Sequence, residues 1–177
     1  MDDVEEAGGQ AVDVPEVIDV LVETPMGSRA KYEWDERRNA MRLDRRLVSA
    51  AVFPADYGCL PGTRGADGER LDVLVLTREP TFPGCWVQAR PIGVFWIAFG
   101  DEGGPLTREA KIVAVPAGDP EWADIHDVTD LPAHQRETIS QFFDVYKELE
   151  PGHIPSPDGY DGRRVALEVL AASRRTL

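Results

Sequence analysis

Three carboxylates lie within six positions of one short segment. The segment reads Asp67-Gly68-Glu69-Arg70-Leu71-Asp72-Val73. On an extended chain the side chains at positions 67 and 69 share a face, and the glycine turn can bring position 72 alongside them. Mg²⁺ takes oxygen ligands of this kind in a near-octahedral arrangement and keeps several waters. The segment by itself therefore fits two interpretations, a hard-metal site and an ordinary solvated turn.

Acidic and basic side chains that could assist such a site lie on either side of this segment. They are Glu23, Lys31, Glu33, Arg45, Tyr57, Asp101, Glu109, Lys111, Tyr146 and Lys147. Acids can hold metal ions, whereas Arg, Lys and Tyr can bind phosphate oxygens. This mixture suits phosphoryl transfer, which is catalysed mainly by positioning and charge neutralisation. The G-x-x-x-x-G-K-[ST] pattern does not occur, which makes a P-loop enzyme unlikely.

Short strands are expected to position most of these residues. β-Branched and alternating patterns predict strands at residues 17–23, 30–34, 41–45, 72–76, 86–91, 93–99 and 110–115. On the second of these strands the alternation places Lys31 and Glu33 on one face. The many Gly and Pro residues between the strands favour a small barrel with functional loops over a helical bundle.

Two helices are predicted near the end of the chain. Apolar residues three and four positions apart predict a helix over 133–149, with Pro151-Gly152 ending it. Its apolar positions are Ile139, Phe142, Phe143, Tyr146 and Leu149. Residues 155–162 are predicted to form a loop and residues 163–174 a C-terminal helix, with apolar contacts from Val165, Leu167, Val169 and Leu170. Strands first and helices last predict an α+β domain.

Composition limits the organisation and the partners of the chain. Its 177 residues suit one domain, which we expect over 16–177 after a disordered acidic tail at 1–15. The 32 acidic and 19 basic residues give a net charge of −13, which argues against nucleic acid and anionic membrane as partners. Cys59 and Cys85 show no metal or redox spacing. The N-terminus is acidic and unlike a signal peptide. Together, the cysteine spacing and the N-terminus predict a cytoplasmic protein.

Seven motifs, in unbroken order from about residue 17 to 150, resemble those of the soluble family I inorganic pyrophosphatases. Lys31-Tyr32-Glu33 resembles the family's K-Y-E strand, Leu43-Asp44-Arg45 its L-D-R strand, and residues 67–73 its D-G-D-P-x-D-V loop. The segments 53–58, 90–93, 110–116 and 142–150 are similar to Y-P-x-x-Y-G, R-P-x-G, K-x-x-A-V-P and F-F-x-x-Y-K-x-L-E. The resemblance implies a five-stranded OB-like β-barrel with flanking α-helices and magnesium-dependent hydrolysis of pyrophosphate.

The resemblance also implies a role for each site residue. Asp67, Asp72 and Glu109 would hold the tightest Mg²⁺, and Asp72 would bridge to a second ion. Ions that arrive with the substrate would be held with the help of Glu23, Asp101 and Glu109. Glu69 would deprotonate the attacking water, and with Asp72 and Tyr57 it forms the expected catalytic set. Phosphate oxygens would contact Lys31, Arg45, Tyr57, Lys111, Tyr146 and Lys147, with Glu33 in support. Several Mg²⁺ per site, Mn²⁺ as a substitute and a homo-oligomer, with a hexamer favoured, are also implied.

The chain departs from the family pattern at several positions. Glu69 and Glu109 stand where Asp is expected, Arg70 replaces Pro, Phe53 replaces Tyr, and His153 replaces a common Lys. The loop over 100–109, which carries Asp101, is also longer than usual. A displacement of about 1 Å can cost about a hundredfold in rate. Two interpretations stay open: a working pyrophosphatase, or a divergent paralogue with weak activity, another phosphoanhydride substrate, or phosphate or metal binding alone.

Overall fold

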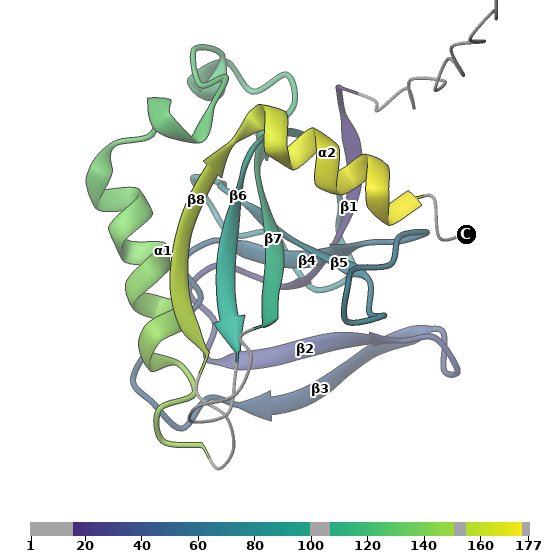
Figure 1. The fold of residues 1–177 in the computed structure, drawn as a ribbon. Coiled ribbons are helices and arrows are strands. Elements are labelled where there is room, and N and C mark those ends of the chain that lie inside the picture. Colours follow the sequence, from purple (N-terminus) through teal and green to yellow (C-terminus); the bar gives the residue numbers. More distant parts are fainter. Residues whose placement is uncertain (1–15, 100–106, 151–154, 175–177) are drawn as a thin grey trace, which may run out of the picture.

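Five strands close into a barrel in the structure, which is a computed structural model and describes residues 16–99, 107–150 and 155–174 (Figure 1). Their order is β1 (Ile18–Thr24), β4 (Asp56–Leu60), β5 (Leu71–Val75), β7 (Thr107–Pro116) and β6 (Trp86–Phe99). β6 also pairs with β1, which closes the ring. β5 and β7 are parallel, and the other neighbours are antiparallel. The predicted five-stranded barrel is confirmed.

A hairpin stands apart from the barrel as a second, two-stranded sheet (Figure 1). It consists of β2 (Ala30–Asp35) and β3 (Ala40–Arg46), joined by a turn in which Asn39 has a φ of 51°. The Thr24 hydroxyl at the end of β1 donates to the Tyr32 carbonyl at 3.1 Å and accepts from the Tyr32 N–H at 2.9 Å. This threonine thus helps to dock the hairpin against the barrel.

Two helices cover the barrel. α1 (Ala133–Val145) packs through Ile139, Phe142 and Phe143, and α2 (Arg163–Arg174) packs through Ala166 and Leu170. Two short 3-10 helices, Pro120–Trp122 and Val128–Asp130, precede α1. Both faces of the sheet are buried, since neighbouring residues of β5 belong to different apolar clusters. In the described ranges no helix is both long enough and apolar enough to cross a membrane.

Several sequence predictions need correction. Residues 155–162 were expected to be a loop, but Ser156–Gly162 forms β8, an edge strand held by its pairing with β6. The strands expected at 86–91 and 93–99 are one strand, β6, with a register shift between Pro91 and Gly93. The helix predicted over 133–149 is shorter, since α1 ends at Val145. Leu149 was expected to be one of its apolar contacts, but its side chain is 65% exposed. β4 was not predicted as a strand.

Other predictions fall outside the described residues or are confirmed. The tail at 1–15, Asp101, Pro151-Gly152 and His153 lie outside the described ranges. The C-terminal helix has the predicted bounds, and its Val165, Leu167 and Val169 pack partly buried against the core. Cys59 and Cys85 are free thiols.

Candidate active site

Two cavities meet at Asp72. The first, which we call the carboxylate cleft, has a volume of about 680 Å³, and its acidic lining consists of Glu23, Glu33, Glu36, Asp67, Glu69 and Asp72. The second, the cation pocket, has a volume of about 180 Å³ and includes Lys31, Tyr57, Asp72, Glu109, Lys111, Tyr146 and Lys147. Lys31, Tyr57 and Asp72 line both. The carboxylate cleft, whose acids suit metal cations, therefore adjoins the cation pocket, whose positively charged lining suits anions.

Strand register brings the central groups together. Asp72 on β5 is the direct partner of Lys111 on β7, and the Lys111 ammonium donates to the Asp72 carboxylate at 2.5 Å and to Glu109 at 3.2 Å. The Tyr57 hydroxyl donates to the same Asp72 oxygen, also at 2.5 Å. Lys111 lies two positions after Glu109, so both side chains leave β7 on one face.

These contacts set the protonation of the central groups. Burial alone would lower the pKa of Lys111, but the carboxylates of Asp72 and Glu109 outweigh it and raise that pKa. Burial, followed by the charge of Asp72, raises the pKa of Tyr57 well above its usual value. At neutral pH Lys111 is therefore a cation and Tyr57 a neutral hydrogen-bond donor.

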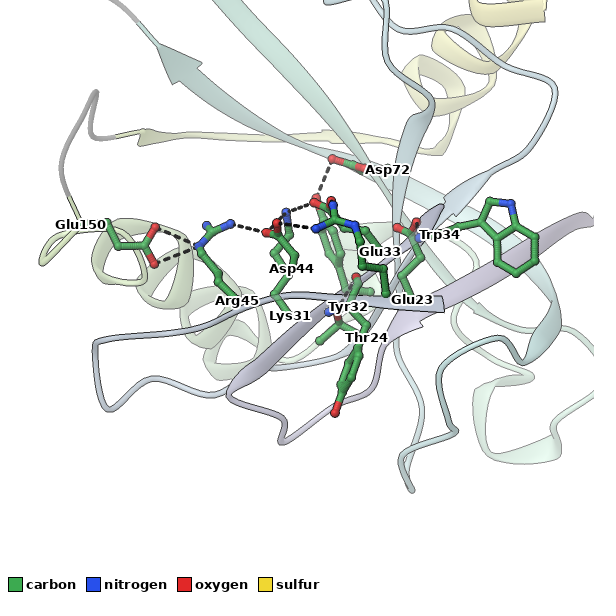
Figure 2. Close-up of polar contacts among 12 residues, drawn as sticks. Glu23, Thr24, Lys31, Tyr32, Glu33, Trp34, Asp44, Arg45, Asp72 and Glu150 are labelled. Carbon is green, nitrogen blue, oxygen red and sulfur yellow. Dashed lines mark hydrogen bonds and ion pairs between the residues drawn. The ribbon is translucent and has the colours of Figure 1, made fainter. Parts of the chain in front are cut away.

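The hairpin supplies further cations. Lys31 on β2 pairs directly with Arg45 on β3. Figure 2 shows a chain of ion pairs from Glu150 through Arg45 and Asp44 to Lys31. Arg45 lies 3.0 Å from Glu150 and 2.6 Å from Asp44, and Lys31 lies 2.6 Å from Glu33. The predicted common face of Lys31 and Glu33 is confirmed by this last contact.

The turn after α1 adds Tyr146 and Lys147. Burial raises the pKa of Tyr146 to about 12, so its hydroxyl stays protonated. The pKa of Lys147 is lowered, first by burial and then by the positive charges of Arg45, Lys31 and Lys111. Positive charges are thus concentrated enough to oppose one another, and a bound anion would relieve that repulsion.

Glu23 is a buried acid at the edge of the cleft. It is 8% exposed, and its carboxylate accepts a hydrogen bond from the Trp34 N–H at 2.9 Å (Figure 2). Burial, with smaller contributions from the charges of Asp72 and Glu33, raises its pKa. A cation in the cleft would favour the ionised form of this carboxylate.

The loop before β5 presents its acids to the cleft. Gly68 has a φ of 82°, a conformation that glycine adopts readily. The Asp67 carboxylate accepts from the Glu69 N–H at 2.9 Å, and both side chains are exposed. Asp67 and Glu69 line the cleft together with Asp72.

The donor set fits a hard cation, although no metal centre is ready-made. Asp67, Asp72 and Glu109 line one further groove of about 230 Å³ between the loop before β5 and α2. Within the described ranges, however, no three acidic, histidine or cysteine side chains converge closely enough to hold an ion. The Lys111 ammonium lies between Asp72 and Glu109 instead. Carboxylate oxygens are the ligands that Mg²⁺ and Mn²⁺ prefer.

Three side chains of the site were not identified from the sequence. Asp44 and Glu150 hold Arg45, and Glu36 accepts from Arg70 across the cleft. Asp44 and Glu150 lay within quoted motifs, so their motif positions were a usable signal. Glu36 lies in a polar turn and gave no signal, since its partner comes from a different part of the chain.

Comparison with known proteins gives a consistent result. The family model described as inorganic pyrophosphatase matches residues 20–177. The inorganic pyrophosphatase of Leifsonia xyli is 45% identical over 154 residues, which cover 87% of this chain and 91% of that protein. The inorganic pyrophosphatase of Methanosarcina acetivorans is 40% identical over 159 residues, covering 90% and 91%.

Solved structures agree with the sequence relatives. The inorganic pyrophosphatase of Thermus thermophilus matches with a TM-score of 0.85 and 36% identity, covering 97% of this chain and 95% of that one. The enzyme of Helicobacter pylori matches with a TM-score of 0.85 and 32% identity, covering 94% and 98%.

Proposed function

This chain belongs to the inorganic pyrophosphatase family, and we propose that it hydrolyses pyrophosphate where the carboxylate cleft meets the cation pocket. The reaction breaks the phosphoanhydride bond and gives two phosphates. The observation that carries this proposal is the position of Asp72, which lines both cavities and contacts Lys111 and Tyr57. Asp72 can therefore act on the cations and the phosphates of one bound complex.

Mg²⁺ is the metal ion proposed for this site, with Mn²⁺ as a substitute and several ions per site. The ligands would be Asp67, Asp72, Glu109, Glu23 and Asp101, of which Asp101 lies outside the described residues. When bound, the ions would neutralise phosphate charge and make a bound water more acidic. The support is the all-oxygen donor set and the size of the cleft.

The basic and phenolic side chains are proposed to bind and orient the substrate. Phosphate oxygens would replace the carboxylate oxygens that now contact these cations. The phosphate-binding set is Lys31, Arg45, Tyr57, Lys111, Tyr146 and Lys147. Glu33 would hold Lys31 in place, as it does at 2.6 Å. Charged groups fixed in this way stabilise developing charge without reorganising.

Glu69 is proposed to take the proton of the attacking water. Its side chain is exposed in the cleft, and the turn at Gly68 and the Asp67 contact fix its backbone. Compared with an aspartate, its extra methylene lengthens the reach of the carboxylate to the water.

Phosphate release from pyrophosphate tests the function directly. Purified protein would be assayed with Mg²⁺ and then with EDTA, beside a variant that carries the family residues at positions 53, 69, 70 and 109. Fast release that EDTA abolishes supports the proposal. Release by the restored variant alone would overturn it and point to another phosphoanhydride or to binding without turnover.

We also propose a cytoplasmic homo-oligomer, with a hexamer favoured, and no nucleic-acid partner. The free thiols of Cys59 and Cys85 favour a reducing compartment, and the net charge of −13 disfavours a phosphate backbone. Light scattering coupled to gel filtration measures the assembly, and a monomer at micromolar concentration would contradict it.

A further inference from the structure

Arg70 places a positive charge inside the carboxylate cleft. It lies directly before β5, its side chain is 24% exposed, and it lines the cleft together with the six acids named above. Its guanidinium donates to the Glu36 carboxylate, which belongs to the turn of the hairpin. It also donates to the thiol of Cys59 on β4 at 3.7 Å. The proposed reaction uses none of these contacts.

Strand geometry places the Arg70 guanidinium on the same face of the sheet as Asp72. Cys59 and Asp72 are direct partners in the β4–β5 register, so their side chains leave the sheet on the same face. Arg70 lies two positions before Asp72 and contacts the Cys59 thiol, which brings its charge to that face. The charge also reaches Glu23, since Arg70 contributes a lowering of that acid's pKa against the larger effect of burial.

Two other cations, Lys31 and Arg64, also line the cleft. Lys31 pairs with one cleft acid, Glu33, at 2.6 Å. The exposed Arg64 guanidinium donates to the Gly68 carbonyl at 2.8 Å, and water screens its charge. Arg70 pairs with Glu36, which is itself one of the six cleft acids and is 72% exposed, so water screens this ion pair. Part of the Arg70 charge is thus left to act on the other five acids of the cleft.

We propose that Arg70 is an internal counter-ion of the carboxylate cleft, which offsets acid–acid repulsion in the metal-free enzyme and weakens the binding of divalent cations there. This inference rests on the proposed metal site. Arginine stays protonated at all accessible pH values, so the effect is permanent. A unit charge about 10 Å from a divalent ion changes its affinity about fourfold even at the dielectric constant of water. Arg70 thereby raises the metal concentration that the enzyme needs.

Calorimetric titration of Mn²⁺ into the metal-free full chain, without substrate and at low ionic strength, measures the effect. Arg70→Met should bind Mn²⁺ about fourfold more tightly than the unmodified chain, whereas Arg70→Lys should stay within about twofold because it keeps the charge. Arg78→Met is the matched control, since Arg78 pairs with Glu121 at 2.7 Å outside the cleft. It removes the same charge and should leave the affinity unchanged.

Glu36→Gln separates an effect of charge from a mechanical clamp between the hairpin and β5. It breaks the same ion pair but removes a negative charge, so an internal counter-ion predicts weaker Mn²⁺ binding, opposite to Arg70→Met. Changes of the same sign in both variants, or unchanged affinity in Arg70→Met, would overturn the proposal. If neither the unmodified chain nor any variant binds Mn²⁺, the proposed metal site is wrong as well. Phosphate release by the unmodified chain tests the proposed hydrolysis independently of this titration.

Thermal melting gives a second measurement. In EDTA, Arg70→Met should melt below the unmodified chain, because the cleft acids lose their counter-ion, and saturating Mg²⁺ should narrow the gap by binding the folded state. A gap that Mg²⁺ leaves unchanged would assign Arg70 a purely structural role and contradict the inference.

Discussion

Lys111 on β7 lies directly opposite Asp72 on β5, and its ammonium donates to the Asp72 carboxylate at 2.5 Å. This register places a base beside an acid that lines both the carboxylate cleft and the cation pocket. The Lys111 side chain is 7% exposed and that of Asp72 is 28% exposed. Asp72 is therefore open to a ligand, while Lys111 is held behind it.

Asp72→Asn should abolish most of the hydrolysis while leaving the fold intact. The amide is close in size to the carboxylate but lacks the charge that would bind Mg²⁺ and face Lys111. We expect kcat to fall by about a hundredfold or more, as when a single transition-state contact is removed. Phosphate release under saturating Mg²⁺ measures it. Asp19→Asn, an exposed position on β1, is the control and should keep full activity.

Glu69 should tolerate a shorter acid but not an amide. Glu69→Gln removes the proposed proton acceptor, so kcat should fall by about 10²–10⁴-fold. Glu69→Asp keeps a carboxylate and should retain activity within about tenfold. A Gln variant with normal kcat would assign proton removal to another group.

Local pattern was sufficient to predict much of what positions the site. Alternation put Lys31 and Glu33 on one face of β2, and their side chains are in contact. The apolar spacing of residues 163–174 gave α2 its bounds. The segment 67–73 indicated the acids that line the cleft. In each case residues close together along the chain determine the local structure, so the spacing of residue types is enough to predict it.

Tertiary contacts determine the rest. Arg45 meets Glu150 across 105 positions, and no local pattern encodes such a pairing. β8 is a strand because β6 offers it a free edge, although Pro157 and Gly159 disfavour strands. Leu149 follows the helical spacing, yet α1 ends four residues earlier and leaves it exposed. The Gly and Pro residues between strands favoured a small barrel, but its five-stranded OB-like form was implied only by the family resemblance.

Glu23→Gln should stabilise the metal-free protein at neutral pH. Burial raises the pKa of Glu23 above its ordinary value of 4.5, so the folded state binds this proton more tightly than the unfolded state. Stability therefore falls as the pH rises from about 4.5 through the folded pKa, and ionised Glu23 is a constant cost above it. The amide carries no such cost and can still accept from the Trp34 N–H.

Melting curves in EDTA between pH 4 and 8 measure this difference. The melting temperature of Glu23→Gln should exceed that of the unmodified chain at pH 7, by about 2–4 °C for each kcal/mol. The two should converge below about pH 4.5. Glu79→Gln, at an exposed position, is the control and should melt with the unmodified chain at pH 7. A lower melting temperature for Glu23→Gln at pH 7 would mean that the carboxylate stabilises the metal-free fold.

Gly58→Ala should damage both the barrel and the site. Gly58 pairs with Val22 on β1 and with Val73 on β5. A Cβ there would lie 2.1 Å from the Leu21 carbonyl oxygen and 2.9 Å from the Val22 Cα. These are backbone atoms, so the strands themselves must separate. Overpacking of this kind costs about 1–3 kcal/mol, and the shift would reach the neighbouring Tyr57 and its bond to Asp72.

Thermal melting and kcat together check this expectation. Gly118→Ala is the matched control, because Gly118 has a φ of 79° but no atom within 4 Å of an added Cβ. Its cost should be the strain of the left-handed backbone alone, about 1–2 kcal/mol, with kcat unchanged. Gly58→Ala should lower both the melting temperature and kcat, since β4 carries Tyr57. If Gly58→Ala kept kcat at the level of Gly118→Ala, the close packing of β1 on β4 would not be what positions the Tyr57 hydroxyl.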